Sequence, residues 1–256
     1  MARYVIYLCR CREEADESHS PEEFSLLKVE TTLTNTMIEK LKSALHNCFK
    51  FPTLLVLPRY RAVLQDLTIE VYAHKHALPL LAQADGVVVA VAPDLKMVFG
   101  MSKMVRDRGA DTIQQEALKV APLVPGEAFV GSGAKYRFKH IALAVIFDEF
   151  KRPTPEYISK SISNAIRMLR EKGAKSVVVA DMTENLLAQT NWITDKQREA
   201  TAELTARIMV EAIIASGGNA KNIKIWCVEP ENAKFFINEL KRHEQEEKSA
   251  SKAVPG

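Results

Sequence analysis

Two clusters of polar side chains in this sequence could bind a metal ion or transfer protons. In the first, His74-Lys75-His76, the two imidazoles would lie on the same face of a strand. The second comprises Asp181, Glu184 and Asp195, carboxylates that suit a divalent cation or general acid and base chemistry. No third ligand follows the histidines at a fixed spacing, so a solvated turn explains them. Helix capping explains the acids, because Thr194 and Asp195 precede a helical segment. We therefore predict no metal site.

Basic and aromatic side chains alternate over a short segment that could bind nucleic acid. Lys135, Arg137 and Lys139 would contact phosphates, while Tyr136 and Phe138 would stack on bases. A solvated rim that leads into a strand explains the same pattern. The formal net charge of +3 is too small to favour nucleic acid by itself.

The four cysteines indicate neither a disulfide framework nor a zinc site. Cys9 and Cys11 are separated by one residue, whereas zinc-binding pairs usually have two to four residues between them. Cys48 and Cys227 are too scattered to supply a second pair. Strand-edge thiols in a reducing compartment are the simpler interpretation.

The elements that must position these groups change character along the chain. Residues 3–9 and 24–31 have the composition of strands, residues 34–49 have helical spacing of apolar side chains, and residues 53–57 form a short apolar run. From residue 67 onward strands alternate with helices, which predicts a parallel or mixed sheet covered on both faces. The expected strands are 67–73, 86–92, 129–131, 140–145, 176–180 and 223–228. The expected helices are 101–120, 155–172, 196–216 and 231–247.

Length and composition agree with a globular protein. The chain has 256 residues, of which 47% are hydrophobic and 26% are charged, so it can bury a core and does not resemble a disordered chain. Its apolar runs are strand-sized, shorter than the roughly 20 residues of a membrane helix. The N-terminus lacks the apolar region of a secretory signal. We expect a cytoplasmic location and no membrane partner.

One run joins an apolar strand to a helix through a short loop: ADGVVVAVAPDLKMVFGMSKMV, residues 84–105. Further segments follow at residues 107–125, 126–128, 131–141, 173–180, 206–213 and 223–240. In order and spacing they resemble the macro domain family, of the ADP-ribose-binding or Appr-1''-p-processing type. The resemblance implies a three-layer α/β/α fold with a mixed central sheet.

The resemblance also implies a division of the chain. Residues 66–243 correspond to the macro-like domain, preceded by an N-terminal α/β extension, residues 1–65, and followed by a flexible tail, residues 244–256. The extension could lengthen the sheet, cover an edge strand or form a dimer contact. The sequence leaves these alternatives and the oligomeric state open.

The first ligand loop that the resemblance implies is changed in this chain. In the family an amide at the end of the strand contacts the distal ribose and, in hydrolytic members, helps to position the reaction. The two amide positions correspond here to Val89 and Ala92. The Gly-rich turn corresponds to Val98, Phe99 and Gly100, so bulky side chains stand where backbone N–H groups would approach a diphosphate.

The remaining family contacts are changed as well. The second Gly-rich loop corresponds to residues 181–185, in which Asp181 and Glu184 would repel a diphosphate. The adenine-binding Gly-Asp falls near residues 73–74, and the aromatic that stacks on the base falls on Val228. The positions equivalent to the family pocket are Asp85, Val89, Ala92, Val98, Phe99, Gly100, Met101, Asp181, Met182, Thr183, Glu184, Asn185 and Val228.

These changes predict a divergent binding module whose ADP-ribose pocket is lost or retuned to another nucleotide or partner. An apolar group of Val98, Phe99 and Met101 with Leu186, Leu187 and Trp192 would either plug the cleft or form a partner surface. Two alternatives stay open: a working ADP-ribose-binding or ADP-ribosyl-hydrolysing macro domain, and a nucleic-acid-binding protein. We assign no catalytic residue and expect no cofactor.

Overall fold

The computed structural model describes residues 2–10, 25–33, 58–73, 84–107, 111–133, 138–150, 152–187, 194–216 and 221–253. Contacts divide the chain into two units, Met1–Leu57 and Pro58–Gly256. In the first unit, β1 (Ala2–Arg10) and β2 (Ser25–Leu33) pair as an antiparallel hairpin. Both strands were expected from the sequence. The helix expected at residues 34–49 and the strand expected at 53–57 lie outside the described residues.

The second unit is built on one mixed sheet. Its strands, among the described residues, are β3 (Tyr60–Leu64), β4 (Leu67–Ala73), β5 (Gly86–Val91), β6 (Ala128–Ser132), β7 (His140–Val145), β8 (Ser176–Ala180) and β9 (Asn222–Cys227). They lie in the order β3-β4-β9-β8-β5-β7-β6. The inner strands run parallel, and the edge strands β3 and β6 are antiparallel to their neighbours. Every residue of β5 is buried, as expected for a strand covered on both faces.

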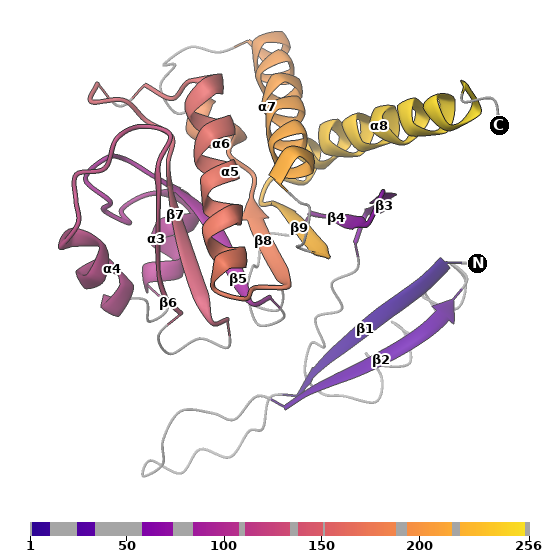
Figure 1. Cartoon of the computed structure of the whole chain (residues 1–256), viewed down its shortest axis with the longest axis horizontal. Coiled ribbons are helices and arrows are strands. Elements are labelled where there is room, and N and C mark those ends of the chain that lie inside the picture. The colour runs from indigo at the N-terminus through magenta and orange to yellow at the C-terminus, as the bar shows by residue number, and fades with distance from the viewer. Residues whose placement is uncertain are drawn as a thin grey trace. The chain divides into compact units, whose positions relative to one another are not determined.

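Helices cover both faces of this sheet and complete three layers, α/β/α (Figure 1). The longer ones, α5 (Pro155–Glu171), α7 (Asp195–Ser216) and α8 (Ala233–Ala253), share one apolar cluster with alternate residues of the strands. The shorter α3 (Gly100–Asp107) and α4 (Asp111–Leu118) contact β5 and β6. Two short elements follow β8 and β9: α6 (Thr183–Leu187) and the 3₁₀ turn η1 (Pro230–Asn232).

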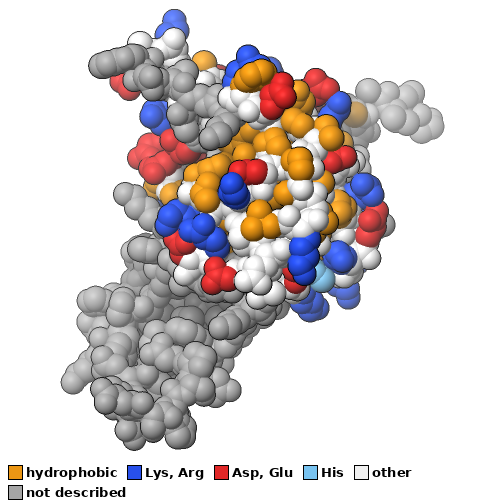
Figure 2. All heavy atoms as spheres, turned by 90° about the vertical axis from the view of Figure 1, so that its left-hand side faces the viewer, with side chains coloured by type: hydrophobic (Ala, Val, Ile, Leu, Met, Phe, Trp, Pro, Cys, Tyr) orange, Lys and Arg blue, Asp and Glu red, His pale blue; other side chains and the backbone are white. Residues whose placement is uncertain are grey.

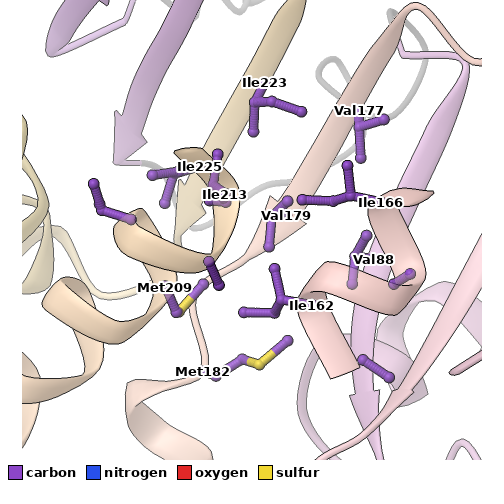
Figure 3. Close-up of a cluster of buried hydrophobic side chains, with 14 of the residues drawn as sticks. Val88, Ile162, Ile166, Val177, Val179, Met182, Met209, Ile213, Ile223 and Ile225 are labelled. Atoms are coloured by element: carbon purple, nitrogen blue, oxygen red, sulfur yellow. The ribbon is translucent and has the colours of Figure 1, made fainter. Parts of the chain in front are cut away.

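The core lies between the sheet and the long helices, as Figure 3 shows. Ile162 and Ile166 of α5 and Met209 and Ile213 of α7 are fully buried in it. The expected inward stripe of α5 is confirmed, because its four apolar positions are all inaccessible: Ile158, Ile162, Ile166 and Leu169. Burial of such side chains stabilises the fold by about 1.5–3 kcal/mol each. Hydrophobic contact with the sheet therefore fixes α5 and α7.

The structure corrects several expected boundaries. The helix expected at residues 101–120 is two helices, α3 and α4, and Asp111 stands in the first turn of α4, where a carboxylate is favourable. The second unit, Pro58–Gly256, includes β3, which pairs with β4. Helix α8 continues to Ala253, through most of the predicted tail. None of the described helices has the length and apolar composition needed to cross a membrane.

Tyr60 ties the edge strand β3 to the last helix. Its hydroxyl donates a hydrogen bond of 2.7 Å to the carboxylate of Glu244 in α8, and Lys241 Nζ lies 5.5 Å from the ring centroid. Burial, the hydrogen bond to Glu244 and the charge of Glu244 together raise the pKa of Tyr60 to about 12. The neutral phenol is therefore the form that the folded protein stabilises.

We expect Tyr60→Phe to lower the free energy of unfolding by about 1 kcal/mol at neutral pH, because one hydrogen bond to a charged acceptor is lost. Because the pKa of Tyr60 is higher in the folded protein, the phenol stabilises the fold at pH values below its pKa in the unfolded chain, about 10. This contribution disappears as the pH rises through the pKa of the folded protein. Urea unfolding of both proteins at neutral pH and at about pH 11 measures this. A difference that stays constant between these pH values would contradict the assigned role of the phenol.

Candidate functional site

The two predicted ligand loops leave neighbouring parallel strands. β5 pairs with β8, and Val88 lies opposite Val179 in the register. The loops that follow these strands therefore open at the same edge of the sheet, the carboxyl edge, where α/β folds commonly bind ligands. The structure thus places residues 92–101 and residues 181–187 side by side, with Asn185 Nδ2 3.9 Å from the position of a Cβ on Gly100.

Hydrogen bonds hold the main chain of the first loop, residues 92–101, along its length. The Gln114 side chain of α4 accepts a hydrogen bond from Met97 N at 2.7 Å and donates one to the Leu95 carbonyl at 3.0 Å. Leu95 is fully buried with a φ of +54°, a conformation that costs a non-glycine residue free energy. Leu123 N donates to the Pro93 carbonyl at 3.0 Å. The path of the main chain toward α3 is therefore fixed.

At the end of this loop the bulky side chains point in different directions. Phe99 is half-buried, and its ring meets Phe147 edge to face with centroids 5.4 Å apart. Val98 is 51% exposed. Gly100 has a φ of +52°, and a Cβ there would have Asn185 Nδ2, at 3.9 Å, as its nearest neighbour. The turn thus keeps a glycine in the left-handed region, and a Cβ there would be in ordinary van der Waals contact with Asn185.

The second loop begins with a carboxylate that faces inward. Asp181 Oδ1 accepts hydrogen bonds from Thr183 N at 2.8 Å and Thr183 Oγ1 at 2.6 Å. Asp181 Oδ2 accepts one from Asn232 Nδ2 at 2.8 Å, which ties α6 to η1. Burial raises the pKa of Asp181 despite these hydrogen bonds, and Glu184 raises it further. The pKa of the buried Cys227 thiol is raised by burial and by Asp181.

The other acids of this region are engaged with neighbours. Glu184 pairs with Arg198 of α7 at 3.2 Å, so its charge is partly compensated. Thr194 caps α7 by accepting a hydrogen bond from Gln197 N at 3.3 Å, while the Gln197 side chain accepts one from Thr194 N at 3.0 Å. This capping box confirms the expected role of Thr194. Within the described ranges, Asp181, Glu184 and Asp195 form no metal-binding group.

Several predicted positions lie in the core. Val89 is fully buried in β5, and Met182 belongs to the apolar cluster between the sheet and the helices (Figure 3). Ala92, Met101 and Val228 are half-buried near the ends of their elements. In the predicted apolar plug, Leu186 packs on the core and Leu187 is buried, and Trp192 lies outside the described residues. Phe99, Leu186 and Leu187 thus turn inward, whereas Val98 does not.

Asp85 lies at the opposite, amino edge of the sheet. Its carboxylate Oδ2 accepts hydrogen bonds from Lys175 N at 2.9 Å, Ser176 N at 3.0 Å and Ser176 Oγ at 3.2 Å. Its carbonyl accepts from Lys139 N and His140 N at 2.9 and 3.0 Å. Asp85 therefore joins the starts of β5, β7 and β8 and does not come near the two loops.

The predicted nucleic-acid contacts are divided between described and undescribed residues. Lys139 lies at the amino edge, where its ammonium is 3.5 Å from the Asp85 carboxylate. Lys135, Tyr136 and Arg137 lie outside the described residues, as do His74-Lys75-His76. Lys139 is therefore at the edge of the sheet opposite the two loops.

Sequence reasoning missed Asn232 and Gln114, which hold the two loops in place. Asn232 is nearly buried and reaches Asp181 across 51 positions of the chain. Nothing local distinguishes it from the other polar residues that precede a helix. Gln114 belongs to the polar side of a helical pattern, so its contacts with Leu95 and Met97 had no signal in the sequence either.

On the face that carries α4 and the edge strand β6, apolar side chains gather over the centre, with a few charged side chains among them and more around the rim (Figure 2). Large exposed apolar side chains of this part of the chain include Leu118 at the end of α4, Val120 and Val124 after it, and Phe150 after β7. Arg152 lies over the Phe150 ring, 4.8 Å from its centroid.

Comparison with known proteins identifies the fold. No family model and no curated protein sequence matches the chain. Among solved structures, the Oceanobacillus iheyensis macrodomain with MES bound has a TM-score of 0.59 at 14% identity, covering 73% of this chain and 97% of that one. A structure of that protein with ADP has a TM-score of 0.56 at the same identity and coverage. The Trypanosoma brucei macrodomain in complex with ADP-ribose has a TM-score of 0.52 at 12% identity, covering 66% and 68%. This chain therefore has the macrodomain fold.

Proposed function

We propose that this chain is a nucleotide-binding module of the macrodomain type, which binds ADP-ribose or a related nucleoside diphosphate without hydrolysing it. Solved macrodomains with 12–14% identity to it hold ADP or ADP-ribose. The observation that carries the proposal is the conformation of Gly100 at the start of α3. Gly100 is the first residue of the eight-residue helix α3, with a φ of +52°, and the position of its Cβ lies 3.9 Å from Asn185 Nδ2 of the second loop. A bare left-handed turn at a helix start lets a phosphate approach backbone N–H groups.

The two acids of the second loop repel a diphosphate less strongly than the sequence suggested. Asp181 directs both carboxylate oxygens to protein donors, and Glu184 is paired with Arg198. Their net effect on a diphosphate is therefore smaller than that of two bare carboxylates. The pocket is retuned in its side chains, while the turn that would receive phosphate is retained.

Binding without hydrolysis follows from the side chains at the strand end. Val89 is buried in the sheet and Ala92 is half-buried, and neither carries a polar side-chain group. The resemblance places at these positions the amides that contact the distal ribose and help to position the hydrolytic reaction. Without them, the site offers no group there to orient the reacting bond.

Calorimetric titration of the protein with ADP-ribose and with ADP tests the proposal, and we expect saturable binding of both. Gly100→Ala should lower stability by roughly 1–2 kcal/mol, because a Cβ strains the left-handed conformation. It should also weaken binding about tenfold or more, because the Cβ would occupy the space through which a phosphate approaches the turn. No heat of binding from the unaltered protein would overturn the proposal.

Gly173→Ala is the matched control. Gly173 has a φ of +85° with nothing within 4 Å of an added Cβ, and it follows α5, away from the loops. Gly173→Ala should lower the free energy of unfolding about as much as Gly100→Ala does, and it should leave the affinity for ADP-ribose and ADP unchanged. Equal effects of the two substitutions on affinity would remove Gly100 from the site. Release of ADP-ribose from an ADP-ribosylated protein would contradict the absence of hydrolysis.

A further inference from the structure

The side chain of Asn185 lies across the site from Gly100. Asn185 belongs to α6, and its Nδ2 is the nearest atom to the position of a Cβ on Gly100, at 3.9 Å. Its backbone N–H donates to the Met182 carbonyl at 3.1 Å. The side-chain amide itself makes no hydrogen bond with any residue that the structure describes, and the residue is half-buried. A directed amide is therefore available at the boundary between the two loops.

The fold does not need this amide to hold α6. Asp181 fixes the start of α6 through Thr183, and Glu184 joins α6 to α7 through Arg198. Thr183 and Leu187 supply its buried contacts. Asn185 is thus the polar side chain of α6 that has no structural partner among these residues, and α6 holds it at a fixed place.

The geometry points to Asn185 as the side chain of the second loop that contacts the bound nucleotide, donating a hydrogen bond from its amide to a phosphate oxygen that lies against Gly100. This inference rests on the proposed function and names one contact within it. An amide carries two donors and one acceptor, so its nitrogen suits a phosphate oxygen. Asn185 then supplies, from the opposite loop, the side-chain amide that the first loop lacks at Val89 and Ala92. Asp181 acts through Thr183 as a positioning residue for this contact.

Three variants titrated with ADP test the assignment: Asn185→Ala, Asn185→Asp and the control Asn238→Asp, in the exposed part of α8. Asn185→Ala should weaken binding about tenfold, as expected for one hydrogen bond to a charged group. Asn185→Asp should weaken it further, because a carboxylate replaces the donor and repels phosphate. This additional loss should shrink at high salt, since exposed charges are screened. Asn238→Asp should bind as the unaltered protein does.

The outcomes separate the two proposals. If the unaltered protein fails to bind ADP, both the proposed function and this contact are overturned. If it binds ADP and both Asn185 variants bind equally well, the contact alone is overturned. If Asn185→Asp keeps full affinity while Asn185→Ala loses it, the residue contacts a hydroxyl group rather than phosphate, and the assignment fails. Urea unfolding of each variant confirms that affinity is compared between folded proteins.

Discussion

Replacing Asp181 by alanine should destabilise the protein by about 2–4 kcal/mol, because buried donors that lose their acceptor cost about 1–3 kcal/mol each. The donors are Thr183 N and Oγ1, at 2.8 and 2.6 Å, and Asn232 Nδ2, at 2.8 Å. Thr183 is fully buried and Asn232 nearly so, so water does not replace the carboxylate. Removal of a desolvated charge offsets part of the loss. Nucleotide affinity should fall as well, since α6 loses its anchor.

Asp181→Asn is the matched control for this prediction. Its carbonyl oxygen can accept both hydrogen bonds from Thr183, and rotation of the Asn232 amide presents an oxygen to the new Nδ2. Stability should therefore be no lower than that of the unaltered protein, and affinity should stay close to it. Chemical denaturation and calorimetric titration with ADP measure the two effects. A loss in Asp181→Asn as large as in Asp181→Ala would show that the charge matters, and would contradict a purely positioning role.

The pH dependence has a defined sign. Because burial raises the folded pKa of Asp181, this group favours the fold most below its unfolded value of about 3.9, and the contribution is lost as pH rises through the folded value. Asp181→Asn removes that dependence. The variant should therefore gain stability relative to the unaltered protein between about pH 4 and neutrality. A constant difference across this range would count against a buried, ionising carboxyl group.

Asp85→Ala should also destabilise the protein, by about 2–3 kcal/mol, but leave nucleotide affinity unchanged. Three hydrogen bonds from Lys175 and Ser176 converge on Asp85 Oδ2 and join the starts of β5 and β8. Asp85→Asn keeps an oxygen for these donors and loses mainly the pairing with the exposed Lys139, so it should cost less than about 1 kcal/mol. The same unfolding and titration measurements apply. Weaker nucleotide binding by Asp85→Asn would place Asp85 in the ligand site after all.

The pH dependence of Asp85 has the opposite sign from that of Asp181. Burial by itself raises its pKa, but the hydrogen bonds from Lys175 and Ser176 and the charge of Lys139 bring the pKa below the usual value. Its contribution is thus present above the unfolded value of about 3.9 and is lost as the pH falls through the folded value. The difference between the unaltered protein and Asp85→Ala should shrink in acid. Persistence of the full difference there would contradict an ionised Asp85.

Elements with strong local patterns could be predicted from the sequence. The strand β5 was found because a strand buried on both faces is apolar at every position. The helix α5 was found because its buried side chains recur with the helical period of 3.6 residues. The short α6 was missed, since a five-residue helix has too few positions to show a period. β3 was missed as well, although it continues the sheet through a tight turn at Gln65, which has a φ of +52°.

The sequence by itself determined the order of strands and helices, because each element depends on a pattern of neighbouring residues. Its resemblance to a known family added the fold class and the expectation that two loops form one site. Tertiary structure alone decided what the site residues contact. β9 lies between β4 and β8, which brings Asn232 to Asp181 across 51 positions. The same sheet places Asp85 at the far edge and turns Asn185 toward Gly100. Such contacts depend on which distant strands pair. The partner of a polar side chain produces no periodic pattern in the neighbouring sequence, so it cannot be predicted from that pattern.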